Sequence, residues 1–267
     1  MNKETKKLSS KEYWDDVLSN GRIPFEVHSK QYSTWLIDSF FNKYIQKNTH
    51  KTLFEAGAGS SAWLPYLSKK YNLTVSGLDY SETGCRICEE NLKLLKIKYD
   101  EIICEDIFKW HSDKKYDIII SLGLIEHFDN PFDVLKILSN HINPSGIIIT
   151  VIPNLLGISG KLTKNFLPEV YKIHKIISEE ELKAIHEKAG FITLKCNYTG
   201  FFYPMIIPLQ VKKSGFFFKE STIRRNISIK MFLLLNILIT KILRALQIKP
   251  ASKTFSPFII YVGKSVT

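Results

Sequence analysis

The chain has 267 residues, enough for one large domain or for a domain with a modest insertion. Hydrophobic residues make up 45% of it and charged residues 24%, the proportions of an ordinary soluble globular protein. The start of the chain is basic, but no apolar run comes after it. The sequence therefore argues against a signal peptide, and we expect a cytoplasmic protein.

The four cysteines argue against a structural zinc site. Cys85 and Cys88 have the CxxC spacing of a metal ligand pair, but Cys104 and Cys196 lie far apart and do not complete a tetrahedral site. We expect four reduced thiols, as is usual in the cytosol.

The positive charge is concentrated at the end of the chain. The net charge is +11, and residues 201–267 contain eleven Lys and Arg but only one acid, Glu220, so this segment carries 11 − 1 = +10. Such asymmetry favours an anionic partner: a phosphorylated or carboxylated substrate, a membrane surface or nucleic acid. A solvated basic face without a partner is the alternative.

Hydrophobic periodicity predicts helices that alternate with short apolar strands. Strands closed by glycine, proline or polar residues and separated by helices are typical of a parallel sheet covered on both faces. In chain order, the pattern predicts helices at 12–21 and 29–45, a strand at 51–57, a helix at 61–72, a strand at 73–80, a helix at 81–97, strands at 99–107 and 116–124, a helix at 130–142, a strand at 146–154, a helix at 178–191, and strands at 192–201 and 255–264.

An apolar helix is also expected within the basic segment, at residues 231–246. Its uncharged part, residues 231–240, is half the length that a membrane crossing needs, and Lys241 and Arg244 interrupt the remainder of the helix. We expect a helix that is buried or at an interface, with a helix lying on a membrane as the alternative.

The segment FEAGAGSS places an acid and two glycines at the junction of the first strand and the next helix. Glycines at such a junction let the backbone and the helix N-terminus approach a ligand closely. Asp79, about 20 residues further on at the end of the second strand, suits a ribose diol. Glu55 would repel a pyrophosphate and instead suits a ligand with a positive centre, such as a sulfonium or an ammonium group.

Together with GLDYS, CEDIF, YDIIISLGLIEHF and INPSGIIITVIPN, this segment resembles the ordered motifs of class I S-adenosylmethionine-dependent methyltransferases. The resemblance covers roughly residues 50–200 and the closing strand at 258–263. It implies an α/β, Rossmann-like fold with a seven-stranded, mostly parallel sheet and helices on both faces. Strand seven would be antiparallel, between strands five and six. The implied parts are a helical lid (1–50), a cofactor-binding core (51–200), a basic helical insert covering the acceptor site (201–251) and the final strand (252–267).

The resemblance also assigns residues to the cofactor, S-adenosyl-L-methionine. Glu55 to Gly59 would form the turn beneath the methionine moiety, and Asp79 would hold the ribose hydroxyls. Asp106 would accept from the adenine amino group, unless it only caps a helix, and Leu122 would offer backbone atoms, unless it is simply core. The cofactor set is Glu55, Gly57, Ala58, Gly59, Asp79, Tyr80, Asp106, Ile107, Ser121 and Leu122.

Two histidines are candidates for a general base, which methyl transfer to a hydroxyl usually needs. His127 comes after the fourth strand, at the carboxyl edge of the sheet where ligands of this architecture bind, and His174 precedes the helix after strand five. Glu126 would orient a histidine or cap the next turn. No carboxylate cluster at ligand spacing accompanies them, so no metal is expected. Aromatic residues of the first two helices, Trp14 among them, would close over the cofactor or pack the helices.

The favoured function is O-methylation of a small anionic or glycan-type acceptor, for example a sugar nucleotide or a surface-polysaccharide precursor. The basic insert would attract the acceptor, and peripheral contact with a membrane through it is possible. An RNA or protein methyltransferase is the alternative, but no RNA-binding module is recognisable and the Asn/Asp-Pro-Pro-Tyr/Phe motif is replaced by SLGLIEHF. A non-catalytic cofactor-binding partner is a third possibility. The sequence leaves the oligomeric state open.

Overall fold

A seven-stranded sheet with the order β3-β2-β1-β4-β5-β7-β6 forms the centre of the computed structural model. Every pairing is parallel except those of β7, which runs antiparallel to both β5 and β6. This confirms the fold expected from the sequence. The structure describes residues 5–19, 23–28, 31–47, 49–201 and 227–266.

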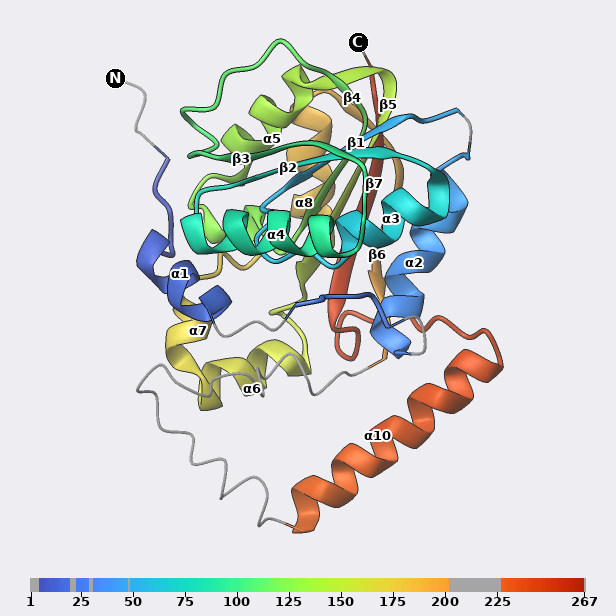
Figure 1. Cartoon of the computed structure of the whole chain (residues 1–267). Helices are drawn as coiled ribbons and strands as arrows, with labels where there is room; N and C mark the ends of the chain where they lie inside the picture. The colour runs from blue at the N-terminus through green and yellow to red at the C-terminus, as the bar shows by residue number, and fades with distance from the viewer. Residues whose placement is uncertain (1–4, 20–22, 29–30, 48, 202–226, 267) are drawn as a thin grey trace.

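Helices lie between and around these strands (Figure 1). The strands are β1 (Thr52–Ala56), β2 (Thr74–Asp79), β3 (Tyr99–Cys104), β4 (Tyr116–Leu122), β5 (Ile142–Pro153), β6 (Phe191–Thr199) and β7 (Phe258–Ser265), and the helices are α1 (Lys11–Ser19), α2 (Tyr32–Tyr44), α3 (Trp63–Tyr71), α4 (Glu82–Leu94), α5 (Pro131–Asn140), α6 (Ile158–Phe166), α7 (Pro168–Lys172), α8 (Glu179–Lys188) and α10 (Ile227–Ala245).

Both faces of the sheet are buried by helices, in two separate hydrophobic clusters. One cluster joins α2, α3 and α4 to the sheet, with Phe41 and Leu64 fully buried in it. The other joins α5 and α8 to the opposite face, with Leu135 and Leu182 fully buried. Figure 1 shows α3 and α4 in front of the sheet and α5 and α8 behind it. Burial on both faces explains why the central strands read as nearly continuous apolar runs.

The structure differs from the sequence-based expectation in two places. The helices α6 and α7, between β5 and α8, were not expected. The helix expected at residues 231–246 is present as part of α10, but it is not buried, since Leu234 is 66% exposed and Leu238 is 55% exposed. Most of the rest of the expected insert, residues 202–226, lies outside the described residues.

The carboxyl ends of β1, β2 and β4 meet at one edge of the sheet. Ala56 is paired with Leu78 on one side and with Ser121 on the other, so the turns after all three strands begin at the same level. Gly77 brings the turn after β1 close to β2, because a Cβ atom at this position would lie 2.8 Å from the Cβ of Ala58.

We therefore predict that Gly77→Ala destabilises the protein by about 1–3 kcal/mol, because the added methyl group overpacks a close contact. Chemical denaturation followed by circular dichroism measures this loss. Thr74→Ala, at the half-buried start of the same strand and without a new Cβ, is the control and should cost less. Equal stability of the wild type and Gly77→Ala would contradict the close approach.

Candidate active site

A cavity of about 330 Å³ lies at this edge of the sheet. Its walls come from the ends of β1, β2 and β4 and from the chain around α1. Nine of the ten residues expected to bind the cofactor line it, namely Glu55, Gly57, Ala58, Gly59, Asp79, Tyr80, Asp106, Ile107 and Leu122. Ser121 does not line the cavity. It is fully buried, and its hydroxyl has no hydrogen-bond partner among the described atoms.

The turn after β1 owes its shape to its two glycines. Gly57 and Gly59 have φ angles of +75° and +41°, a region that residues with a side chain rarely adopt. The amides of this turn bind β2: Gly57 and Ala58 donate to the carbonyl of Leu78, at 2.8 and 3.0 Å, and Gly59 donates to a carboxylate oxygen of Asp79 at 2.9 Å. These amides therefore fix the turn on β2.

Asp79 is the second anchor of the cavity. Besides the Gly59 amide, its carboxylate accepts the Ser81 amide at 2.8 Å. Burial raises the pKa of Asp79, and the hydrogen bonds from Ser81 and Gly59 oppose that rise. A carboxylate has about four acceptor positions, so Asp79 can accept from a ligand hydroxyl in addition to these amides.

Glu55 gives the cavity an unusual acidic group. It is only 3% exposed, and the Ser61 hydroxyl donates to its Oε2 at 2.5 Å. Burial raises the pKa of Glu55 to about 8, with a smaller contribution from the charge of Asp79. A buried acid of this kind is stabilised as a carboxylate when a positive group comes near. The residues present therefore fit the sulfonium and ammonium groups of S-adenosylmethionine.

The chain before α1 forms part of the cavity wall. Lys7 makes an ion pair with Asp106, lies 5.3 Å from the centre of the Tyr80 ring, and forms an antiparallel bridge with Phe128. Asp106 also accepts the Phe108 amide at 3.1 Å, so it caps the local turn as well. Lys7, Ser9 and Leu18 were not singled out from the sequence, because nothing in their local pattern marks them as site residues.

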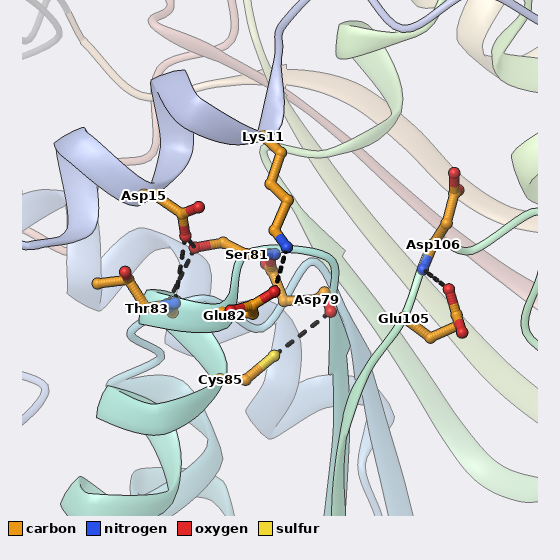
Figure 2. Close-up of polar contacts among 10 residues, drawn as sticks. Lys11, Asp15, Asp79, Ser81, Glu82, Thr83, Cys85, Glu105 and Asp106 are labelled. Atoms are coloured by element: carbon orange, nitrogen blue, oxygen red, sulfur yellow. Dashed lines mark hydrogen bonds and ion pairs between the residues drawn. The ribbon is translucent and has the colours of Figure 1, made fainter.

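Polar contacts hold α1 onto the start of α4 (Figure 2). The Asp15 carboxylate accepts the Ser81 hydroxyl at 2.5 Å and the Thr83 amide at 3.2 Å, and Lys11 pairs with Glu82 at 2.5 Å. The hydrogen bond from Ser81 is the largest influence on Asp15 and lowers its pKa. The part of the expected lid that borders the cavity is therefore α1 and the residues before it, whereas α2 packs against the sheet.

His127 lines the cavity and contacts His174. The ring centroids of the two histidines are 4.4 Å apart, and Trp14 packs edge-on against His127 at 5.0 Å. The Nδ1 atom of His127 lies 2.8 Å from the Ile173 carbonyl oxygen, and the Nδ1 atom of His174 lies 2.6 Å from the Val170 carbonyl oxygen. Because a carbonyl only accepts, each Nδ1 carries the proton, and each Nε2 keeps its lone pair. Burial lowers the pKa of His127 to about 3 and also lowers that of His174, so both rings are neutral.

Glu126 is buried beside the two histidines. It is 2% exposed, its Oε2 has no partner among the described atoms, and burial raises its pKa to about 8. Its backbone carbonyl accepts the Lys175 amide at 2.6 Å. Glu126, His127 and His174 offer donor atoms within 4.8 Å of one another, a combination that can hold a metal ion. Spacing in the sequence did not indicate this trio, because His174 comes from a segment far along the chain.

Comparison with known proteins identifies the family to which the chain belongs. A family model described as a methyltransferase domain matches residues 30–195. The ubiquinone biosynthesis O-methyltransferase of Hydrogenovibrio crunogenus is 27% identical over 161 residues, which are 56% of this chain and 66% of that protein. The (S)-tetrahydroprotoberberine N-methyltransferase of Eschscholzia californica is 28% identical over 99 residues, 37% of this chain and 28% of that protein. The alignments thus span less than two thirds of these relatives.

A solved structure has the same fold. It is a methyltransferase from Thermotoga maritima described as dependent on S-adenosylmethionine and as a possible histamine N-methyltransferase. The TM-score is 0.57 at 16% identity, over 96% of this chain and 94% of that one. The domain match covers more than half of the chain and includes every residue expected to bind the cofactor. The chain therefore belongs to the class I S-adenosylmethionine-dependent methyltransferase family.

Proposed function

We propose that the protein transfers the methyl group of S-adenosylmethionine to an oxygen atom of a small anionic or glycan-type acceptor. The observation that carries this proposal is the pair of neutral histidines, of which His127 lines the cavity and His174 packs against His127. A hydroxyl group must lose its proton as it is methylated, and a neutral imidazole with an available Nε2 can accept that proton. A neutral amine attacks through its own lone pair, so its methylation depends less on a general base.

We assign the cofactor to these residues from the family resemblance, and their place in the cavity wall supports the assignment. Asp79 holds the ribose hydroxyls, Asp106 and Ile107 border the adenine, and Glu55 faces the positive end of the cofactor. S-adenosylmethionine supplies an activated methyl group that leaves its sulfur by in-line displacement. The contribution of this chain is to hold the two reactants in line and to exclude water, and α1 with the residues before it covers the reactants.

The acceptor is inferred to be anionic on two grounds. His127 is a weak base in its buried state, and a negative charge beside it would stabilise the imidazolium and raise its pKa. The segment from residue 201 onwards carries ten net positive charges and leaves and rejoins the sheet at the carboxyl edge. Sugar nucleotides and acidic polysaccharide precursors combine hydroxyl groups with such a charge.

A panel of acceptors tests this function. Incubation with cofactor labelled in the methyl group, and with separate pools of sugar nucleotides, acidic glycans, amines and RNA, should label the sugar nucleotides or acidic glycans. Tandem mass spectrometry and NMR of the labelled product then locate the methyl group on oxygen or on nitrogen. Labelling confined to the amine pool or to RNA would refute the proposal.

For Glu55, we predict that cofactor binding releases a proton at pH 7. The free protein holds a proton on Glu55, since its pKa is about 8, and the positive cofactor favours the carboxylate. Affinity should therefore rise as the pH increases towards 8 and then level off. Calorimetry in two buffers with different heats of ionisation measures the released proton.

Glu55→Gln should abolish this release and weaken binding by about 1.5–3 kcal/mol, the range for hydrogen bonds to charged groups. Asp79→Ala is the matched comparison: it should weaken binding by a similar amount and still release the proton. Proton release that persists in Glu55→Gln would assign the release to another group.

For the histidines, we predict that His127→Asn or His174→Asn lowers turnover by about 10²–10⁴-fold, the usual contribution of a general base. Asparagine keeps an N–H for the backbone carbonyl, so cofactor affinity should change little. His141→Asn is the matched control, because His141 makes the same type of bond, to the Ile137 carbonyl at 2.9 Å, and does not line the cavity.

The same assay tests the metal. If the histidines act as bases, turnover should be unchanged after treatment with a chelator. Loss of turnover on chelation, with recovery on adding a divalent cation, would instead assign Glu126, His127 and His174 to a metal ion. If both asparagine variants keep full activity, neither histidine is the general base, and the rate comes from the positioning of the two reactants alone.

A further inference from the structure

The outward face of α10 is formed by large apolar side chains that are in contact with water. We define this face as Leu234, Leu235, Ile237, Leu238 and Ile242, whose exposed fractions range from 48% to 66%. Exposed apolar residues continue beyond the helix with Leu246, Ile248 and Phe255. Monomeric proteins rarely leave such a contiguous apolar surface uncovered unless it contacts something.

The two buried side chains of α10, among those whose burial is described, are polar and lie on the opposite face, which differs from the usual arrangement. Asn236 and Thr240 are 6% and 7% exposed, and the Thr240 hydroxyl donates to the Asn236 carbonyl at 2.8 Å. A surface helix in water places its apolar residues inwards and its polar residues outwards. The arrangement seen here therefore fits a helix whose outward side meets an apolar phase.

Positive charge accompanies the outward face. Lys241 is exposed among its leucines and isoleucines, and Lys249 and Lys253 are exposed just beyond the helix. The sequence from residue 221 to residue 267 contains no acidic residue. Apolar side chains edged by lysines match the acyl chains and the headgroups of an anionic lipid layer.

The position of α10 places this face on the same edge of the sheet as the cavity. Both β5 and β6 run antiparallel to β7, so they point the same way and the chain leaves β6 at the carboxyl edge. In the sequence, α10 comes after β6 and before β7. The returning chain is tied to this edge, since the Ile158 amide donates to the Thr254 carbonyl at 2.9 Å. Figure 1 shows α10 beyond the same end of the sheet as α6.

We propose that the outward face of α10 docks on an anionic lipid surface, with the helix lying along the membrane. No helix among the described residues is long and apolar enough to cross a membrane, so the contact is peripheral. A second copy of the chain is a poorer occupant of this face, because two such helices would bring positive charges together with no acid to offset them. The docking requires neither cofactor nor acceptor, and therefore does not depend on the proposed reaction.

Sedimentation of the full chain with vesicles tests the docking. We expect binding to vesicles of phosphatidylcholine mixed with phosphatidylglycerol, much weaker binding to phosphatidylcholine alone, and a decline with added salt. The double variant Leu234→Glu with Leu238→Glu should lower binding about tenfold or more. Lys241→Glu with Lys253→Glu should lower binding to the anionic vesicles by about fivefold for each lysine replaced.

Matched variants elsewhere control for changes in composition. Leu94→Glu, at a leucine 54% exposed at the end of α4, and Lys136→Glu, at an exposed lysine of α5, should bind vesicles like the wild type. Unchanged cofactor affinity would show that each variant is folded. Absence of binding to anionic vesicles, or equal binding by both α10 variants and the wild type, would overturn the proposal. The proposal would also be overturned if the wild type forms a dimer that dissociates in the double leucine variant and does not bind vesicles.

Discussion

The carboxylate and carbonyl of Asp79 connect the segments from which the cavity at the sheet edge is built. The carboxylate accepts the amide of Gly59 from the turn after β1 and that of Ser81 at the start of α4, and the carbonyl accepts the Glu105 amide after β3. One residue at the end of one strand thus fixes three neighbouring loops. The turn after β1 can come this close only because residue 77 of β2 is glycine. The cavity is therefore a product of the sheet edge, and its shape is set before any ligand arrives.

The sheet and most of the cavity could be predicted from the sequence because the information is local. Short apolar runs with polar or glycine ends specify strands, and the next helix begins at a capping residue: Ser81 accepts the Gly84 amide and Ser178 accepts the Glu181 amide. Parallel strands bring their carboxyl ends together, so Glu55, Gly57 and Asp79 could be expected at one place. The family resemblance added the order of the strands, including the antiparallel β7.

The features that could not be predicted depend on contacts between distant segments. Lys7 reaches Asp106 because the chain before α1 bridges to Phe128, a pairing with no signal in either stretch. His174 meets His127 because α6 and α7, which were not expected, bring the chain back to the turn after β4, where the Lys175 amide donates to the Glu126 carbonyl. The orientation of α10 was hidden for a different reason. A helix of Leu and Ile interrupted by Asn236 and Thr240 reads as buried, and only the fold shows that its polar side faces inwards.

The two strands that flank the basic segment pair directly with each other, and this makes the segment separable from the sheet. The Gly200 amide donates to the Pro250 carbonyl at 2.9 Å, and the Ser256 hydroxyl donates to the Gly200 carbonyl at 2.7 Å, so the chain that leaves β6 and the chain that enters β7 are joined at a narrow neck. The chain between Gly200 and Pro250, which includes α10, is therefore closed at its two ends by those bonds. The entropic cost of closing a flexible loop falls by only about 0.6 kcal/mol for each halving of its length. Exchange of this segment for a short turn, or for the corresponding segment of a relative, is therefore compatible with an intact sheet, so the segment can diverge while the cavity at the sheet edge stays the same.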